Sequence, residues 1–275
     1  MNREIDYLFS QQQGNPDRIP GLFSPLRTSD NQIPQGNFNK SLVVVDSTGR
    51  EYIIRQENPH GRTLELPFVE AEYKGVGFLE HPQNGFRLRT AVEQHQFTIF
   101  LRENGIRASR TVYSKGDIQI ISYENGAVNL ADLWNSGDPR APIVTDMALI
   151  KLAESHNKGF ILGDRWGPNE LLTADGEIMF VDFDIEIFGA EAKEFEMASM
   201  LYFNSYFAQQ PNSAEDLNGL VEIYKEFFAS SLFAKLYNKA LLLDYLTRYF
   251  CYFANEGKYR WHNQNQASKF LQNLI

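Results

Sequence analysis

The sequence predicts an α+β protein in which a small β-rich half precedes a larger helical half. Short runs rich in β-branched and aromatic residues, separated by turn residues, dominate the first half. In the second half, apolar residues recur at helical spacing and aromatic residues gather toward the C-terminal end. We therefore expect an N-terminal arm (1–32), a β-rich N-lobe (33–125) and a helical C-lobe (126–275).

Composition indicates a globular protein and excludes several classes. Hydrophobic residues make up 43% of the 275 residues, and the net charge of −9 makes general nucleic-acid binding unexpected, because that requires a basic surface. Cys251 is the only cysteine, which excludes an internal disulfide framework. The polar N-terminus does not resemble a signal peptide, and no run approaches 18 apolar residues. We expect a cytoplasmic protein with no membrane insertion.

The N-terminal half is predicted to begin with one short helix near Ile5–Phe9 and to continue with two pairs of strands. The runs Ser41–Asp46 and Glu51–Arg55 flank a glycine-containing turn, which predicts a hairpin. The runs Arg110–Ser114 and Ile118–Tyr123 predict a second pair. This half should therefore contain a small antiparallel sheet.

Two segments connect these strand pairs. Apolar residues alternate with charged ones along Leu66–Lys74, which predicts a strand. Thr90–Asn104 has the spacing of a helix and precedes Gly105, a residue type that often follows a helix end. We therefore expect a strand and then a helix between the two pairs.

The second half is predicted to begin with a helix over Asp146–Asn157. Three short strand-like runs follow, at Phe160–Leu162, Glu170–Leu172 and Ile178–Val181. From Glu191 onward the pattern is helical and rich in Phe and Tyr. We interpret these aromatic stripes as core or partner-facing surfaces rather than as a cofactor site.

Three polar residues stand at informative spacing between the strand-like runs. Asn169 follows Asp164 by five residues, and Asp182 follows Asn169 by thirteen. Phosphoryl transfer needs one carboxylate that orients a hydroxyl, and a carboxamide with a second carboxylate that hold Mg²⁺ against phosphates. Asp and Asn are also common turn formers, but the third acid at this distance favours a functional interpretation.

This pattern resembles the catalytic loop and the metal-binding D-F-G segment of the protein-kinase-like superfamily. Gly163 and Asp164 resemble the H-G-D sequence of aminoglycoside-phosphotransferase-like kinases, and Asp182-Phe183-Asp184 stands where D-F-G would stand. The resemblance covers roughly residues 33–205 and implies a bilobal fold that uses ATP and Mg²⁺. It also implies that Asp164 is the catalytic base and that Asn169 and Asp182 are the metal ligands.

Two departures from the superfamily pattern put regulation of the protein-kinase type in doubt. Leu162 replaces the usual His, and Asp184 replaces the glycine of D-F-G. Nearby, Glu196 resembles an acid at the start of the helix that supports the catalytic loop. His156 is predicted to be a hydrogen-bonded core residue, and Arg165 is expected to contact substrate, to pack or to be solvated.

The resemblance further implies a cation on the third strand and a Glu on the next helix, whose ion pair positions the ATP phosphates. Glu93 is the expected acid. Lys74 is the favoured cation, because nineteen residues separate it from Glu93 and its surroundings loosely resemble selenoprotein-O-like atypical kinases. Arg55 is the alternative, because Tyr52–Arg55 resembles the V-L-R of some small-molecule kinases.

The phosphate-covering loop has two open candidates, Gln35–Lys40 and Ser47–Arg50. Together these features predict a phosphotransferase that moves the γ-phosphoryl group of ATP to a hydroxyl of a small molecule or a protein. The alternatives are an AMP-transferring kinase-like enzyme and a catalytically inactive pseudokinase scaffold. Retention of Asp164 argues against AMP transfer, and the complete set of Asp164, Asn169 and Asp182 argues against the scaffold.

Overall fold

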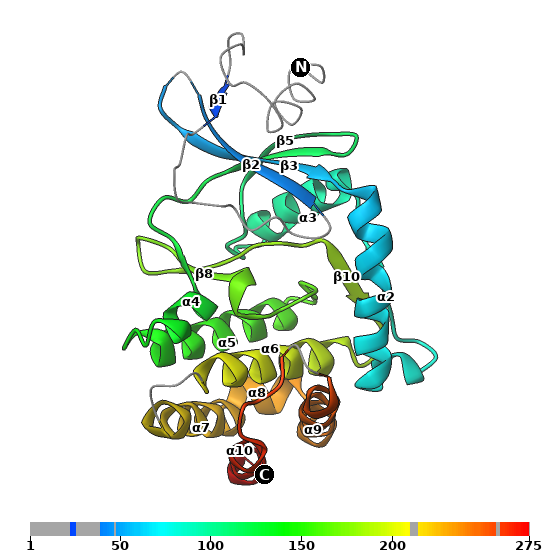
Figure 1. Ribbon diagram of the computed structural model, residues 1–275, viewed down its shortest axis with the longest axis vertical. Helices are drawn as coiled ribbons and strands as arrows, with labels where there is room; N and C mark the ends of the chain where they lie inside the picture. Colours follow the sequence, from blue (N-terminus) through cyan, green and yellow to red (C-terminus); the bar gives the residue numbers. More distant parts are fainter. Residues whose placement is uncertain (1–22, 26–38, 47, 210–213, 257–258, 275) are drawn as a thin grey trace. The chain divides into compact units, whose positions relative to one another are not determined.

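The protein is described by a computed structural model that divides into two compact units (Figure 1). The structure describes residues 23–25, 39–46, 48–209, 214–256 and 259–274. The first unit takes the described chain up to Leu66 together with Thr90–Phe100 and Ser109–Asn125, and the second takes Pro67–Arg89, Leu101–Ala108 and the chain from Gly126. The predicted helix at 5–9 and most of the candidate loop at 35–40 lie outside the described residues.

A five-stranded antiparallel sheet forms the first unit. Its spatial order is β1 (Phe23–Pro25), β2 (Asn39–Asp46), β3 (Glu51–Glu57), β6 (Ile118–Ser122) and β5 (Thr111–Lys115). Strands β2 and β3 confirm the predicted hairpin, and β5 and β6 confirm the second pair. The buried core on one face consists of Val44, Ile54, Ile118 and Ile120. Because side chains alternate between faces, Arg55 and Glu57 lie on the face of β3 opposite to Ile54.

The turn between β2 and β3 closes on the carboxylate of Asp46. Its Oδ1 accepts hydrogen bonds from the amide and hydroxyl of Thr48, at 2.8 and 2.7 Å, and from the amide of Arg50 at 3.0 Å. The hydroxyl of Thr48 is the main cause that lowers the pKa of Asp46 to about 2. Residues 48–50 of the second candidate loop thus form a tight hairpin turn.

Helix α2 (Pro59–Gly75) occupies the segment where the sequence predicts a strand over Leu66–Lys74, so that prediction is wrong. Val69 and Tyr73 are one turn apart, and Tyr73 is buried. Lys74 forms an ion pair with Glu70 one turn earlier, at 2.6 Å. The alternation of apolar and charged residues fits both periods, and the Glu, Ala, Leu and Lys content favours the helix.

Helix α3 (Ala91–Glu103) confirms the helix predicted over Thr90–Asn104. Its first turn is capped by carboxylates. Glu93 Oε2 accepts hydrogen bonds from the amide and hydroxyl of Thr90, at 2.8 and 3.1 Å, and Glu57 Oε1 accepts one from the amide of Ala91 at 2.5 Å. The helix ends at Glu103, and Gly105 just beyond it has a φ of +71°, which confirms the predicted stop signal.

The second unit is mainly helical. Its helices are α4 (Leu130–Asn135), α5 (Ala141–Asn157), α6 (Ala192–Ala208), α7 (Ala214–Ala229), α8 (Ser231–Leu236), α9 (Lys239–Asn255) and α10 (Gln264–Leu274). Helix α6 contacts α4, α5, α7 and α9 and is buried along most of its length (Figure 1). Among the described residues, no helix combines the length and the apolar character that crossing a membrane requires.

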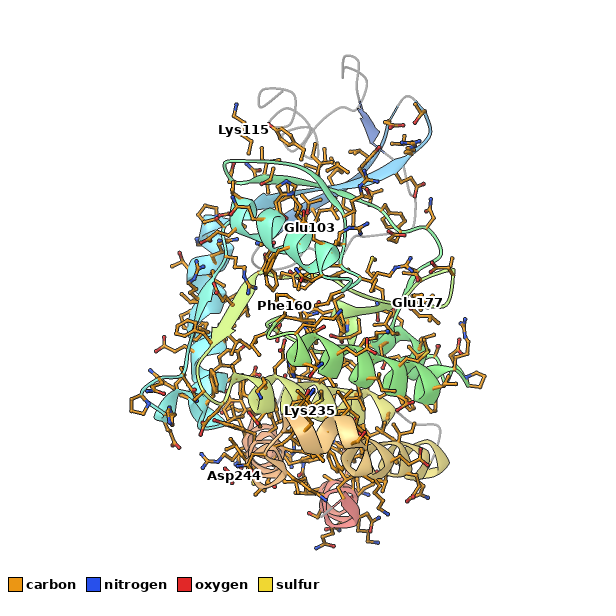
Figure 2. All side chains as sticks on the ribbon, turned by 180° about the vertical axis from the view of Figure 1, so that it is seen from behind. Glu103, Lys115, Phe160, Glu177, Lys235 and Asp244 are labelled. Atoms are coloured by element: carbon orange, nitrogen blue, oxygen red, sulfur yellow. The ribbon has the colours of Figure 1, made fainter. Side chains whose placement is uncertain are left out.

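Aromatic side chains pack α6 against α9, which confirms the predicted aromatic core (Figure 2). Tyr249 of α9 stacks on Tyr202 and on Phe195 of α6, with ring centroids 5.6 and 5.7 Å apart. Phe195 also stacks on Phe78 of the 3₁₀ helix η1 (Phe78–Glu80), at 4.1 Å. Such pairs contribute beyond the apolar area they bury, so α6 is held rigidly.

Two small sheets complete the second unit. The three-stranded sheet contains β7 (Val128–Asn129), β8 (Glu170–Leu172) and β9 (Ile178–Phe180), and the two-stranded sheet pairs β4 (Gly85–Leu88) with β10 (Ile185–Phe188). The β8–β9 hairpin confirms the strands predicted at Glu170–Leu172 and Ile178–Val181. Phe160–Leu162, which the sequence predicts as a strand, forms none: the amide of Leu162 bonds to the side chain of Glu196.

Candidate active site

The three motif residues lie on neighbouring loops of the second unit. Asp164 follows α5, Asn169 ends the 3₁₀ helix η2 (Gly167–Asn169) immediately before β8, and Asp182 lies two residues beyond β9. The antiparallel β8–β9 pairing brings the ends of these loops together, and the amide of Val181 donates to the carbonyl of Asn169 at 3.0 Å. The side-chain Nδ2 of Asn169 donates to the backbone carbonyl of Asp164 at 2.9 Å.

Asp164 stands in an environment that favours its neutral form more than water would. Desolvation by the surrounding protein is the main cause that raises its pKa, to about 6, and the negative charges of Asp182 and Glu196 act in the same direction. The neighbouring guanidinium of Arg165 opposes this shift. A carboxylate with this pKa is still largely ionised at neutral pH, and it can accept a proton more readily than an exposed Asp.

Asp182 has an unusual backbone conformation. Its φ is +58°, and no other non-glycine residue of the described chain has a positive φ. The left-handed region costs an ordinary residue roughly 1–2 kcal/mol, so such a conformation persists only when the surroundings hold it.

Arg165 is the side chain that holds this segment, and the sequence left its role open. It is fully buried, and its Nη2 donates to the carbonyls of Asp182 and Val181 at 2.8 and 3.0 Å. Its Nη1 donates to the carbonyl of Asn169 at 3.3 Å and lies 3.6 Å from Oε1 of the equally buried Glu170. The sequence analysis did not single out Glu170. The available signal was that Arg165 and Glu170, two opposite charges, flank Asn169 among largely uncharged residues.

Gly163 brings the catalytic loop against β10. Its φ is +111°, and a Cβ at this position would lie 2.0 Å from the carbonyl oxygen of Ile185. Arg89, a buried residue that the sequence analysis missed, holds the segment around Ile185 in place. Its Nη1 donates to the carbonyls of Phe183 and Ile185 at 3.1 and 3.0 Å. The strand that follows Asp182 is therefore fixed from two directions.

Glu196 of α6 binds the loop that carries Asp164, as the sequence predicts. Its carboxylate accepts hydrogen bonds from the amides of Gly163 and Leu162, at 2.6 and 3.2 Å. His156 is confirmed as a buried core residue: Nε2 lies 2.6 Å from Glu196 Oε2, and Nδ1 lies 2.6 Å from the hydroxyl of Tyr237. This network ties α5, α6 and the loop together.

The predicted phosphate-binding residues fall in different units. Arg55 and Glu93 belong to the first unit, whereas Lys74 lies in the part of α2 that belongs to the second. Lys74 is well exposed and is engaged with Glu70, so the structure contradicts its expected place on a strand. Arg55 stands on a central strand, opposite Gln119 of β6.

The face of the sheet that carries Arg55 is the face at which α3 begins. Glu57 shares this face with Arg55, and its carboxylate accepts from the amide of Ala91. Gln119, the cross-strand neighbour of Arg55, donates from Nε2 to the carbonyl of Ala91 at 2.5 Å. Glu93 follows two residues later in the first turn of α3.

The donor set of the second unit fits a magnesium ion. The amide nitrogen of Asn169 is engaged with Asp164, which leaves its side-chain oxygen as the possible ligand, and Asp182 supplies a carboxylate. Nowhere in the described chain do three or more His, Cys, Asp or Glu residues gather as a metal site. Magnesium does not need such a cage, because it usually takes one or two protein ligands together with phosphates and water.

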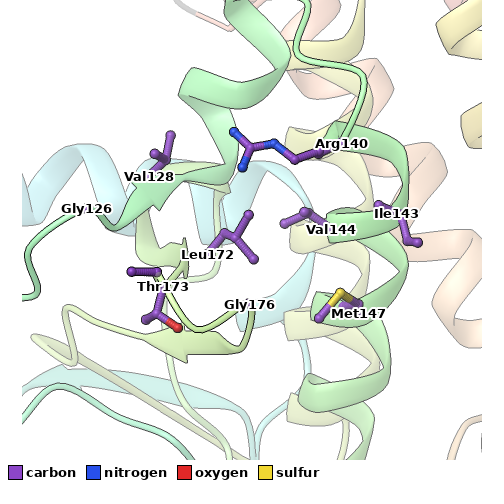
Figure 3. A pocket seen from close by; sticks show the side chains of 10 residues that line it. Gly126, Val128, Arg140, Ile143, Val144, Met147, Leu172, Thr173 and Gly176 are labelled. Carbon is purple, nitrogen blue, oxygen red and sulfur yellow. The ribbon is translucent and has the colours of Figure 1, made fainter.

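A separate pocket of about 310 Å³ lies between the β8–β9 hairpin and the first turns of α5 (Figure 3). Its walls are mainly apolar and include Val128, Val144 and Leu172. The guanidinium of Arg140 at its rim is already bound to Asp138, at 2.7 Å. Arg140 is therefore not free to act as a cation toward a ligand in this pocket.

Comparisons by sequence find no relative: no family profile matches the chain, and no curated protein matches it significantly. Comparison of structures finds a Mycobacterium tuberculosis protein solved in complex with erythromycin. The two are 15% identical with a TM-score of 0.38, over 67% of this chain and 55% of the other. The chain thus spans little more than half of the length of that protein.

Two further similar structures are described as kinases. One is the Rio2 kinase of Chaetomium thermophilum, solved with ADP, Mg²⁺ and phosphoaspartate; it is 13% identical with a TM-score of 0.45, over 90% of this chain and 84% of the other. The second is an ethanolamine kinase of Plasmodium vivax, 11% identical with a TM-score of 0.45, over 97% and 84%. These likenesses concern the fold and not the activity.

The protein-kinase-like fold is visible in the chain itself. A five-stranded antiparallel sheet has a helix, α3, between its third strand and its last hairpin. A helical unit then carries an Asp-containing loop, a short hairpin and a second Asp in that order. This is the order in which protein kinases present their phosphate-binding strand, catalytic loop and metal-binding segment.

Proposed function

We propose that this protein is an ATP- and Mg²⁺-dependent phosphotransferase that moves the γ-phosphoryl group to a hydroxyl of a small molecule or a protein. The observation that carries the proposal is the convergence of Asp164, Asn169 and Asp182 on two loops joined by one hairpin. A structural loop would not require these three groups together beside a supporting carboxylate, Glu196.

Asp164 orients the acceptor hydroxyl and receives its proton. Its raised pKa, about 6, suits this role, because the group is ionised at neutral pH and is still a better base than an exposed Asp. Asn169 and Asp182 bind Mg²⁺, which, when bound, neutralises charge on the phosphates. The rigid support from Glu196 keeps the base in place, so catalysis depends mainly on positioning.

In the first unit, we propose Arg55 rather than Lys74 as the cation that binds the ATP phosphates. The contacts of Glu57 and Gln119 with Ala91 support this choice, because they place Arg55 on the face where the first turn of α3 carries Glu93. A guanidinium can bind phosphate through two parallel hydrogen bonds, so an arginine is chemically adequate.

Regulation by a phosphorylated activation loop is not part of this proposal. Only residues 183–191 separate Asp182 from α6, and they contain no Ser, Thr or Tyr. Four of them form β10, which pairs with β4. We therefore expect the metal-binding segment to be assembled without a covalent switch.

The test is mass spectrometry of a reaction mixture containing the protein, ATP, Mg²⁺ and a broad panel of hydroxyl-bearing acceptors. The proposal expects an acceptor that gains the mass of one phosphate, and no gain with the Asp164→Ala variant. A gain of AMP would support the AMP-transferring alternative. Protein that binds ATP but modifies nothing in the panel would support the scaffold.

A further inference from the structure

The side chain of Arg165 bonds to backbone on both sides of the candidate metal site. Through three carbonyl oxygens it joins the residue before β8 to the residues after β9: Asn169 at 3.3 Å, Val181 at 3.0 Å and Asp182 at 2.8 Å. Asn169 and Asp182 are the two proposed metal ligands. A single planar guanidinium therefore holds the backbones of these two residues in a fixed relative position.

The guanidinium itself is firmly held. It lies against the rings of Phe180 and Phe183, with Cζ 5.8 and 5.3 Å from their centroids. Glu170 stands 3.6 Å away, and neither of its buried carboxylate oxygens has a hydrogen-bond partner. Burial is the main cause that raises the pKa of Glu170, to about 8, and the charge of Arg165 opposes that shift. Glu170 is therefore a polar neighbour of Arg165 that is largely protonated at neutral pH, and not a full counter-charge.

The hydrogen bond from Arg165 to Asp182 matters because of the backbone conformation of Asp182. Asp182 is in the left-handed region, and its own carbonyl accepts the shortest of the three bonds from Arg165. A residue held at φ +58° turns its side chain in a direction that an extended backbone would not provide. Release of the carbonyl would let the backbone relax and would move the carboxylate.

We infer that Arg165 is a positioning residue, which sets the spacing of the two metal ligands by fixing the backbones of Asn169 and Asp182. This inference rests on the proposed function, because it assigns Asn169 and Asp182 to the metal. Arg165 is fully buried, so it acts through the backbone carbonyls that it binds.

The test separates positioning from folding. Arg165→Met alone would leave the buried Glu170 without its neighbouring cation, so the informative variant is the double substitution Arg165→Met/Glu170→Gln, which leaves no ionisable side chain at either position. Arg165→Lys keeps the charge but loses the planar fork that reaches several carbonyls. Tyr224→Phe is the matched control: it removes a buried 2.8 Å hydrogen bond to the carbonyl of Leu201 elsewhere in the same unit.

Each protein is titrated with Mg²⁺ at a fixed concentration of a non-hydrolysable ATP analogue, and the shift in Tm is recorded. Nucleotide affinity without metal is measured by calorimetry in EDTA. We expect the double variant to need on the order of tenfold more Mg²⁺, the size of effect usual for groups that orient metal ligands, with Arg165→Lys intermediate. Metal-free nucleotide affinity should stay within about twofold, and Tyr224→Phe should lower Tm without changing the Mg²⁺ requirement.

A double variant with the Mg²⁺ requirement of the parent would overturn the inference while leaving the proposed function intact. Failure of both the double variant and Arg165→Lys to fold would also overturn it, because Arg165 would then be a structural residue. A parent protein without any Mg²⁺-dependent shift would contradict the proposed function, and the inference would fall with it.

Discussion

The amide of Gly163 donates a 2.6 Å hydrogen bond to the carboxylate of Glu196, one residue before the proposed base Asp164. Glu196 also accepts from Leu162 and contacts His156, and none of its side chain is exposed. The loop is thus fixed by an acid 33 residues further along the chain.

Glu196→Ala should destabilise the protein strongly. The substitution leaves two buried amides without their acceptor and removes the partner of a buried His, so we expect a loss of about 3–5 kcal/mol in the free energy of unfolding. The control is Glu154→Ala, which breaks an exposed ion pair with Lys151 and should cost less than about 1 kcal/mol. Urea unfolding of both variants makes the comparison; equal losses would contradict the support role of Glu196.

Gly163→Ala should be more harmful than Gly176→Ala, although both glycines have positive φ. At Gly163 the new Cβ would meet the carbonyl of Ile185 at 2.0 Å, whereas at Gly176 nothing lies within 4 Å. Gly176→Ala should therefore cost only the left-handed strain, roughly 1–2 kcal/mol. Gly163→Ala should cost clearly more and should shift the loop before Asp164. Thermal unfolding measures both, and a smaller loss at Gly163 would show that the loop does not pack on β10.

Asp182→Asn should strongly weaken Mg²⁺-dependent nucleotide binding and leave the fold intact. We expect the Mg²⁺ requirement to rise at least about tenfold, the lower end for a residue that merely orients a metal ligand. Asp175→Asn is the control, because this exposed acid lies on the turn of the same hairpin and pairs with Arg107. Calorimetric titration with Mg²⁺ and nucleotide tests both, and an Asp182→Asn protein that binds like the parent would remove Asp182 from the site.

Arg55→Met should lower phosphotransfer on the order of 10²-fold, as loss of one preorganised charge usually does. Lys74→Met should change the rate by less than about twofold, because Lys74 is exposed and paired with Glu70 on a helix. Initial rates at saturating acceptor and varied ATP compare the two variants. The opposite ranking would return the phosphate-binding role to Lys74.

Local sequence signals predicted the hairpins, α3 and the β8–β9 hairpin, because each depends on residues close in the chain. The helical spacing of the aromatic residues was also a local signal, but which helices they would join was not. The motif of Asp164, Asn169 and Asp182 was also recognisable, since one hairpin brings the three together. The strand predicted over Leu66–Lys74 was wrong, because the spacing of Val69 and Tyr73 fits both a strand and a helix. The segment forms a helix, α2, in which Tyr73 is buried.

Local sequence patterns could not predict contacts between segments that are far apart in the chain. The pairing of β4 with β10 joins segments about one hundred residues apart, and neither strand has a strong signal of its own. The role of Arg89 depends on that pairing, because its guanidinium bonds to Ile185 and Phe183. Arg165 stands within the motif, but only the structure shows that it is buried beneath Asp182 and faces Glu170.

The central claim is that the chain transfers phosphate with Asp164 as its base. The most direct test measures ATP turnover and nucleotide affinity of the parent and of Asp164→Ala, with an acceptor that the parent modifies. Loss of a positioned general base should lower kcat by roughly 10²–10⁴. ATP affinity should change little, because Asp164 faces the acceptor and not the nucleotide. A variant that turns over ATP as fast as the parent, or a parent that binds ATP and turns over none with a broad acceptor panel, would contradict the claim.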